Sequence, residues 1–196
     1  MIKFAKTQHI SQCIEIQKNS LSKDILSELN NYFLFYLFFE SCINNINCFF
    51  LVNEEKGTVT SFIIILKNPS KFFFDLLKAS IRNYSYTLHA FLLMIKNVHN
   101  FTKCVLFLKP PINEFFVELP GQMPEIKVIA TRNEYQNKGY GTQLLNYALK
   151  LIDNKCIVKT HSEKAAQFYI KNGGAIAGYE RTGLWKLTIF YFFPIK

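Results

Sequence analysis

The stretch RNEYQNKGYGTQLL, residues 132–145, places two glycines in a polar turn that leads directly into an amphipathic helix. An apolar strand, EIKVIAT at residues 125–131, precedes the turn. The first amides of a helix have no intrahelical acceptors, and the helix dipole adds positive potential there. Because Gly139 and Gly141 carry no Cβ, an anion can approach the backbone closely. The stretch is therefore a candidate phosphate site, although an ordinary strand-to-helix loop also fits a lone pair of glycines.

Two common phosphate-binding motifs do not fit this turn. A Walker loop requires GxxxxGK[ST], which the segment lacks. A dinucleotide-binding fingerprint requires a third glycine where Leu144 stands. What remains is a Q-x-x-G-x-G turn that begins at Gln136, and its interpretation depends on the surrounding sequence.

The longer run EIKVIATRNEYQNKGYGTQLLNYAL, residues 125–149, resembles the acetyl-CoA-binding motif of the GNAT superfamily of N-acetyltransferases. The resemblance implies that backbone amides of the turn hold the pyrophosphate of acetyl-CoA. It also implies that the preceding strand splays from its neighbour and hydrogen-bonds the pantetheine and the acetyl carbonyl. The cofactor-binding residues expected on this basis are Ile129, Thr131, Gln136, Asn137, Lys138, Gly139, Tyr140, Gly141 and Thr142.

A second segment, SEKAAQFYIKNGG at residues 162–174, is similar to the family pattern N-x-x-A-x-x-L-Y-x-K-x-G-F. Ser162 stands in place of the usual asparagine and is included among the expected cofactor contacts, while Gly174 replaces the usual aromatic residue. The resemblance implies that Tyr169 donates a proton to the sulfur of CoA. Helical spacing alone also fits a tyrosine packed in the core.

Glu125, at the start of the strand, matches a glutamate that in some family members draws the proton of the amine through water. A solvated carboxylate at the strand edge is the alternative interpretation. Glu118 and His161 are weaker candidates for the base. Family members commonly transfer the acetyl group directly, and none of the five cysteines lies in a recognisable nucleophile motif.

Hydrophobic periodicity predicts a single α/β (α+β) domain over residues 1–196. The resemblance implies a GNAT fold, with a central mixed, mostly antiparallel sheet flanked by helices. We expect strands at 2–5, 48–52, 58–66, 104–108, 125–131, 156–160, 175–180 and 183–193. The turn signal NEEKG, residues 53–57, predicts that the second and third of these strands form a hairpin. We expect helices at 7–18, capped by Thr7, and at 22–29, 32–43, 71–81, 86–98, 139–154 and 162–172, the last capped by Ser162.

About fifty residues, 69–122, stand between the third and fourth strands, where the family usually has a short turn. Helical spacing and many aromatic residues predict a helical insertion there. An insertion of this length is usually structured or functional. An acceptor-binding lid and additional core or a homodimer surface are the two interpretations.

The formal charge of +9, from 23 Lys and Arg against 14 Asp and Glu, favours anionic partners. The cations are scattered without a run of five, which argues against a nucleic-acid partner. The odd number of cysteines without ligand spacing predicts free thiols, a reducing compartment and no metal site. The apolar run YFLFYLFF, residues 32–39, is too short to span a membrane, so a cytoplasmic protein is expected.

Together these features predict an acetyl-CoA-dependent N-acetyltransferase that transfers directly to the amine of a small molecule. A nucleotide-linked amino sugar is the first candidate acceptor, because the insertion is loosely similar to GNAT enzymes of bacterial surface polysaccharides and because a dianionic acceptor suits the positive charge. Acetyl-CoA alone explains the charge equally well. The alternatives are acetylation of a protein N-terminus or lysine, and a non-catalytic acyl-CoA-binding GNAT module.

Overall fold

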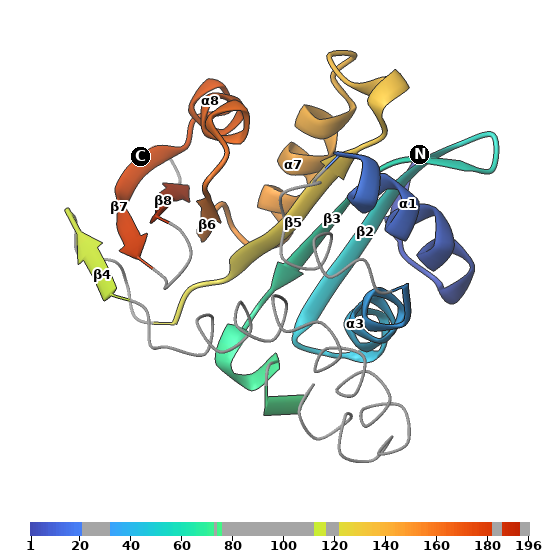
Figure 1. Cartoon of the computed structure of the whole chain (residues 1–196), viewed down its shortest axis with the longest axis horizontal. Coiled ribbons are helices and arrows are strands. Elements are labelled where there is room, and N and C mark those ends of the chain that lie inside the picture. The colour runs from blue at the N-terminus through green and yellow to red at the C-terminus, as the bar shows by residue number, and fades with distance from the viewer. Residues whose placement is uncertain (21–31, 73, 76–111, 117–121, 182–185, 193–196) are drawn as a thin grey trace, which may run out of the picture.

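One sheet of eight strands organises the chain, in the order β1-β2-β3-β5-β6-β8-β7-β4 (Figure 1). The computed structural model describes residues 1–20, 32–72, 74–75, 112–116, 122–181 and 186–192. The strands are β1 (Ile2–Phe4), β2 (Cys48–Glu55), β3 (Thr58–Leu66), β4 (Ile112–Phe115), β5 (Glu125–Thr131), β6 (Cys156–Thr160), β7 (Ala175–Arg181) and β8 (Lys186–Phe192). Among these strands β5 and β6 pair in parallel and the other pairs are antiparallel, which confirms the predicted mixed, mostly antiparallel sheet.

Helices cover both faces of the sheet. They are the 3-10 helix η1 (Thr7–His9), α1 (Ile10–Ser20), α3 (Tyr32–Asn44), the 3-10 helix η2 (Asn133–Tyr135), α7 (Tyr140–Leu151) and α8 (Glu163–Lys171). The expected helices at 22–29 and 86–98, the expected strand at 104–108 and most of the expected helix at 71–81 lie outside the described residues. Within the described part of the chain, no helix combines the length and apolarity needed to cross a membrane.

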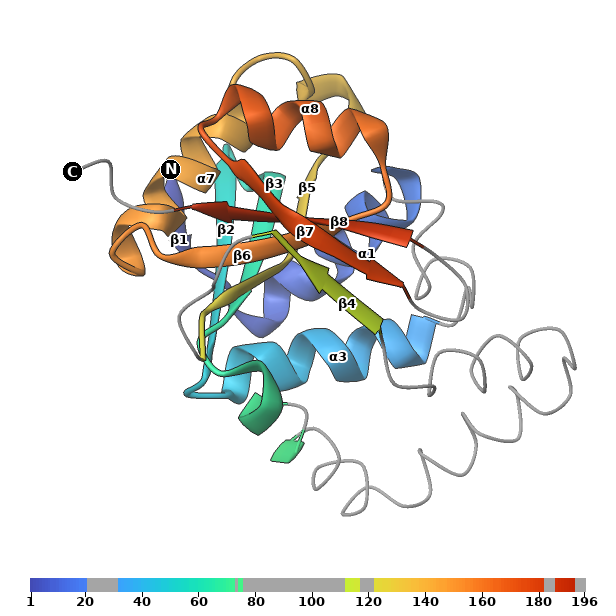
Figure 2. The same cartoon turned by 90° about the vertical axis from the view of Figure 1, so that its left-hand side faces the viewer.

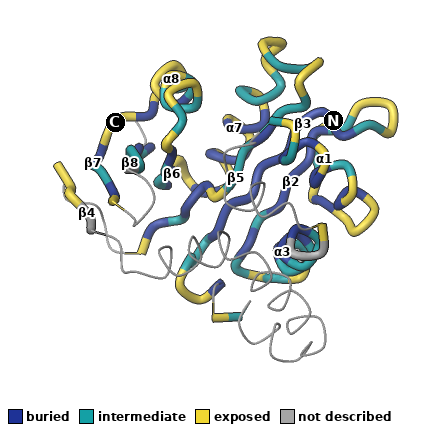
Figure 3. Tube along the Cα trace, in the orientation of Figure 1, coloured by how far each residue is buried: buried dark blue, intermediate teal, exposed yellow. Residues whose placement is uncertain are grey.

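The central strand β3 divides the core in two, because alternate side chains of a strand point to opposite faces. Phe62, Ile64 and Leu66 join a core with α1 and α3. Ile63 and Ile65 join a second core with α7 and α8. Figure 3 shows the resulting band of buried residues along β2 and β3.

The β2–β3 hairpin confirms the predicted strand pair and its turn. Lys56 and Gly57 occupy the turn with φ values of 48° and 82°. A two-residue turn with two left-handed residues matches the right-handed twist of the strands that it joins. Glycine at the second position adopts this conformation without a steric penalty.

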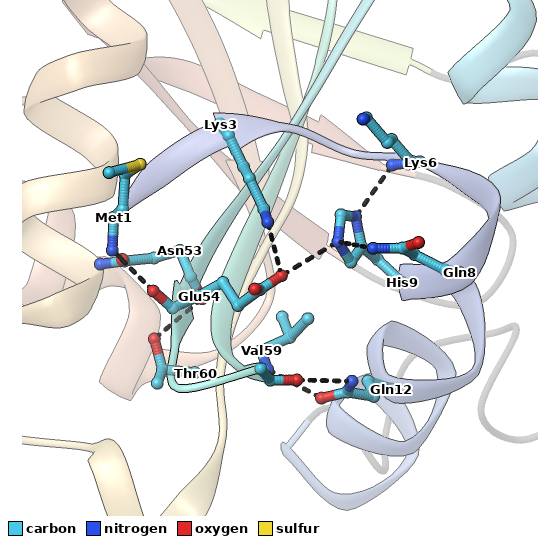
Figure 4. Close-up of polar contacts among 11 residues, drawn as sticks. Met1, Lys3, Lys6, Gln8, His9, Gln12, Asn53, Glu54, Val59 and Thr60 are labelled. Atoms are coloured by element: carbon cyan, nitrogen blue, oxygen red, sulfur yellow. Dashed lines mark hydrogen bonds and ion pairs between the residues drawn. The ribbon is translucent and has the colours of Figure 1, made fainter.

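The predicted cap at Thr7 is wrong. Thr7 begins the one-turn helix η1, and the α-helix starts at Ile10. The backbone N–H of Lys6 donates instead to Nδ1 of His9, at 2.9 Å, and Nε2 of His9 lies 3.0 Å from Glu54 Oε2 (Figure 4). Because Nδ1 accepts a hydrogen bond, the ring proton lies on Nε2 and is donated to Glu54. The buried His9 ring therefore joins η1 to the β2–β3 hairpin.

The insertion contributes a strand that the sequence analysis did not predict. Strand β4 pairs with β7 at the far edge of the sheet, although β3 and β5, on either side of the insertion, are neighbours (Figure 2). Gly178 of β7 permits this pairing, since a Cβ there would lie 2.1 Å from the Glu114 carbonyl oxygen. The Phe116 ring packs edge-on against Tyr179 with a centroid distance of 5.3 Å. The end of the insertion therefore builds the edge of the sheet.

Candidate acyl-CoA site

Strand β5 leaves β6 almost as soon as the two strands meet. Their pairing comprises Glu125 with Ile157 and Ile126 with Val158. A bulge in the β3–β5 ladder leaves Lys127 as an extra residue immediately after this contact, and a bulge bends the strand that carries it. From residue 128 to 131, β5 pairs with β3 and not with β6. This backbone edge is available to hydrogen-bond an extended ligand.

The turn after β5 concentrates backbone N–H groups. Asn137 and Gly139 adopt left-handed conformations, with φ values of 60° and 84°, and Lys138 between them does not. Such alternation creates a concave arrangement of amides that binds anions. Gly139 is the N-cap of α7, without a side-chain hydrogen bond, and the Gln143 N–H donates to its carbonyl at 2.9 Å. The amides of residues 140–142 precede this bond and so have no intrahelical acceptor.

The two glycines of the turn serve different purposes. A Cβ on Gly139 would have no atom within 4 Å, so glycine is required there for its left-handed backbone. A Cβ on Gly141 would lie 3.3 Å from Thr131 Oγ1 and 3.6 Å from the Phe168 ring. Gly141 therefore lets the first turn of α7 pack closely against β5 and α8. The open approach inferred from the sequence applies to Gly139, whereas packing explains Gly141.

Gln136 holds the turn in shape. Its side-chain amide donates to the Thr131 carbonyl at 3.1 Å and to Asn133 Oδ1 at 2.9 Å. Its Oε1 accepts a hydrogen bond of 2.9 Å from Lys164 Nζ. The glutamine thus joins the end of β5 to η2 and brings an α8 ammonium group to the turn. Sequence reasoning missed Lys164, which stands at a variable position of the second motif.

Of the other polar side chains near the turn, Arg132 and Tyr140 contact carboxylates, and Lys138 is exposed. Arg132 makes a bidentate contact with Glu15, at 3.2 and 3.1 Å, so its charge is balanced by α1. The Tyr140 hydroxyl donates to Glu55 at 2.7 Å, and this bond raises the pKa of Tyr140. Lys138 is exposed, with its ammonium 5.6 Å from the Tyr135 ring. Lys138 and Lys164 are therefore the lysines that the structure brings to the turn.

Ser162 caps α8, as predicted. Its Oγ accepts the Ala165 N–H at 3.4 Å, and its own N–H donates to Thr160 Oγ1 at 3.0 Å. Of the two remaining β5 residues among the predicted cofactor contacts, Ile129 packs against the α7 core and Thr131 lies beside Gly141. The predicted cofactor residues are thus grouped at the end of β5, the first turn of α7 and the start of α8.

Tyr169 is 5% exposed and packs against aromatic residues of α8 and β8. Its ring centroid lies 5.4 Å from Phe168, 5.7 Å from Phe190 and 6.3 Å from Phe192. Within the described part of the chain no hydrogen bond involves its hydroxyl. Burial, with a smaller contribution from Cys156, raises the pKa of Tyr169 well above its ordinary value. The phenol therefore keeps its proton at neutral pH and can donate it.

Glu125 lies at the vertex where β5 and β6 begin to diverge. The residue is 8% exposed, and Lys127 Nζ lies 3.5 Å from its Oε1, so a solvated strand-edge carboxylate is not what the structure shows. Cross-strand partners share a face of the sheet, and Glu125 pairs with Leu66 of the α1 and α3 core. Tyr169 belongs to the opposite core, with α7 and α8. The two predicted catalytic residues therefore lie on opposite faces of the sheet.

The described cysteines are buried and form no disulfide with one another. Burial raises the pKa of the Cys156 thiol to about 12 and raises the pKa values of Cys13 and Cys42 as well. Because the thiolate is the nucleophilic form, these groups are poor acyl acceptors at neutral pH. Cys104 lies outside the described residues. Among the residues that the structure describes, no cluster of three or more His, Cys, Asp or Glu has the arrangement of a metal site.

Residues 108–173, which contain the turn, the first motif and the second motif up to Gly173, match the family model described as Acetyltransferase (GNAT) domain. This segment therefore resembles a GNAT domain. The match covers less than half of the chain, and it indicates an acyltransferase, in agreement with the fold. No curated protein matches the sequence.

Solved structures share the fold of this chain over nearly its full length. A GNAT-family acetyltransferase from Streptococcus agalactiae has a TM-score of 0.61 at 11% identity, covering 100% of this chain and 96% of its own. A structure from Corynebacterium glutamicum, described as histone acetyltransferase HPA2 and related acetyltransferase, has 0.59 at 14%, covering 100% and 97%. The PaiA N-acetyltransferase from Thermoplasma acidophilum, in complex with coenzyme A, has 0.54 at 14%, covering 96% of each chain. At these identities the likeness concerns the fold.

Proposed function

We propose that this protein is a GNAT N-acetyltransferase that transfers the acetyl group directly to the amine of a small molecule, within one domain spanning residues 1–196. The arrangement of Tyr169 and Glu125 carries the proposal. The two groups lie on opposite faces of the sheet, and both lie near the first residues of β6. Tyr169 is in the same core as Cys156, which influences its pKa, and Glu125 pairs with Ile157. A proton donor and a proton acceptor thereby flank the place where β5 and β6 separate.

The turn and the free edge of β5 supply the binding site for acetyl-CoA. The amides of residues 138–142 and the lysines Lys138 and Lys164 suit the pyrophosphate. The edge of β5 over residues 128–130, which does not pair with β6, suits the amides of the pantetheine arm. A structural neighbour of the same fold was solved with coenzyme A, which supports this assignment.

Acetyl-CoA supplies an activated acetyl group as a thioester. Glu125, on the α1 and α3 face, takes the proton of the acceptor ammonium through water, so that the neutral amine can attack. As the N–C bond forms and the C–S bond breaks, Tyr169 gives its phenolic proton to the departing sulfur from the opposite face. Cys13, Cys42 and Cys156 take no part, because burial raises their pKa values and keeps them protonated.

A small acceptor, with a nucleotide-linked amino sugar as the first candidate, suits the net charge of +9. The test is to incubate the protein with acetyl-CoA and a panel of amino sugars, nucleotide-linked amino sugars, amino acids and peptides. We expect free thiol and acetylated small amine in equal amounts, with no acetyl group retained on the protein by intact mass. Acetylation of peptides alone, a stable acetyl-protein adduct, or acetyl-CoA binding without turnover would each contradict the proposal.

A further inference from the structure

A second ion pair lies on the same face of the sheet as Glu125. Cys156 and Val158 of β6 are buried in the core with α7 and α8. Lys159 follows Val158 in the strand, so the Lys159 side chain points to the opposite face. Ile157, which points the same way, pairs with Glu125. Lys159 therefore stands two residues beyond the vertex, on the Glu125 face.

Lys159 reaches across β8 to Glu180 of β7. Its Nζ lies 2.5 Å from Glu180 Oε2, and the Lys159 side chain is 25% exposed while that of Glu180 is 8% exposed. The cost of removing two charges from water can exceed the gain from pairing them, so a largely buried ion pair is weak support for stability. Among the described residues Lys159 bonds Glu180 alone, and an ammonium group has three N–H donors. Glu180 fixes the ammonium and leaves donors for a ligand.

The vertex has a matching arrangement on the β5 side. Lys127, whose side chain is 35% exposed, lies beside Glu125, whose side chain is 10% exposed. Each strand thus carries a lysine backed by a buried carboxylate. The main described contacts of α1 and α3 with the sheet are made to β2, β3 and β5, and not to β6, β8 and β7.

We infer that the acceptor is a small amine that also carries an acidic group, a carboxylate or a phosphate, and that Lys159 binds this group. The inference rests on the proposed function. Glu180 is a positioning residue that holds the Lys159 ammonium. Two residues along β6 and one strand spacing separate Lys159 from Glu125, roughly 8 Å between their backbones before the strands diverge. One small molecule can therefore place its amine at Glu125 and its acidic group at Lys159.

Matched acceptor pairs test the inference. One pair is lysine and lysine methyl ester, and the other is glucosamine 6-phosphate and glucosamine, so the two arms distinguish a carboxylate from a phosphate. With the wild type, kcat/KM should be about 10- to 100-fold higher for the acid-bearing member of at least one pair, the range for one charge-assisted hydrogen bond. Lys159→Gln should abolish this preference through KM, so that the two members of the pair react with similar kcat/KM. Lys159→Arg should keep most of the preference.

Lys150→Gln, which removes an exposed charge from α7, is the control and should leave the preference unchanged. The inference is overturned if the wild type shows no preference in either pair, or if Lys159→Gln lowers kcat/KM equally for both members. It is also overturned if uncharged amines are acetylated and acid-bearing amines are not. Failure of the proposed function looks different, since no amine of either kind would then be acetylated by a protein that binds acetyl-CoA.

Discussion

Replacing Tyr169 with phenylalanine separates catalysis from packing, because the substitution removes one oxygen atom and keeps the ring. The contacts of the ring with Phe168, Phe190 and Phe192 remain. The hydroxyl makes no hydrogen bond within the described part of the chain, so its removal should change the free energy of unfolding by less than about 1 kcal/mol. For a chain of this length that corresponds to a Tm shift below about 4 °C.

The effect on turnover should be much larger. A positioned general acid contributes about 10²- to 10⁴-fold, which equals roughly 3–5 kcal/mol of activation free energy. We therefore expect kcat of Tyr169→Phe to fall by at least 10²-fold, measured by thiol release, while the Kd for acetyl-CoA stays within about twofold. Tyr169→Ala is the packing control, since loss of a buried aromatic ring costs about 3–5 kcal/mol of stability. A phenylalanine variant with wild-type kcat would refute the assignment and leave Tyr169 as a core residue.

Three further predictions follow from individual contacts. Gly141→Val should lose about 1–3 kcal/mol of stability in urea unfolding and bind acetyl-CoA more weakly, because its Cβ would lie 3.3 Å from Thr131 Oγ1; unchanged stability would contradict the packing role. Glu125→Gln should lower kcat/KM by about 10²-fold without changing acetyl-CoA affinity, and a rise in Kd instead would argue against a base. Burial lowers the pKa of His9 below 6.5, against the opposing effect of Glu54, so the unfolded chain binds more protons and stability should fall as pH drops below 6.5; equal pH slopes for wild type and His9→Gln would disprove this.

Elements with strong local signals were predictable from the sequence. The hairpin turn at Lys56 and Gly57, the Ser162 cap of α8 and the strand–turn–helix around Gly139 each depend on residues close together in the chain. Their conformations follow from backbone preferences and capping hydrogen bonds, which a single sequence contains. The end of α7 was predicted less well, because the helix stops at Leu151 rather than near Asn154, whose φ is 56°.

Contacts between distant segments were not predictable. Strand β4 joins β7 through the missing Cβ of Gly178, and nothing in the INEF segment itself specifies that partner. The alignment of Lys159 with Glu180 depends on the register of three strands. The Thr7 cap failed because Lys6 is the N-cap of the turn that begins at Thr7, and the buried His9 ring, held by Glu54 of β2, accepts the Lys6 amide. Tertiary packing decided each of these cases.

In the proposed function, the turn before α7 binds the phosphates of acetyl-CoA. Two charge reversals on one helix test it, Lys138→Glu beside the N-terminus and Lys150→Glu in the last turn. A negative charge near a helix N-terminus is stabilising and one near the C-terminus is not, so Lys138→Glu should unfold at the same temperature or higher, and Lys150→Glu slightly lower.

The decisive measurement is a thermal-shift titration of the wild type and both variants with acetyl-CoA. At about 100 times its Kd, acetyl-CoA should stabilise the wild type by roughly 2.7 kcal/mol, a shift of about 5–11 °C. Lys138→Glu should need at least about tenfold more acetyl-CoA for the same shift, and Lys150→Glu should titrate like the wild type. Equal titration of all three proteins, or no shift in the wild type, would contradict a phosphate site at this turn.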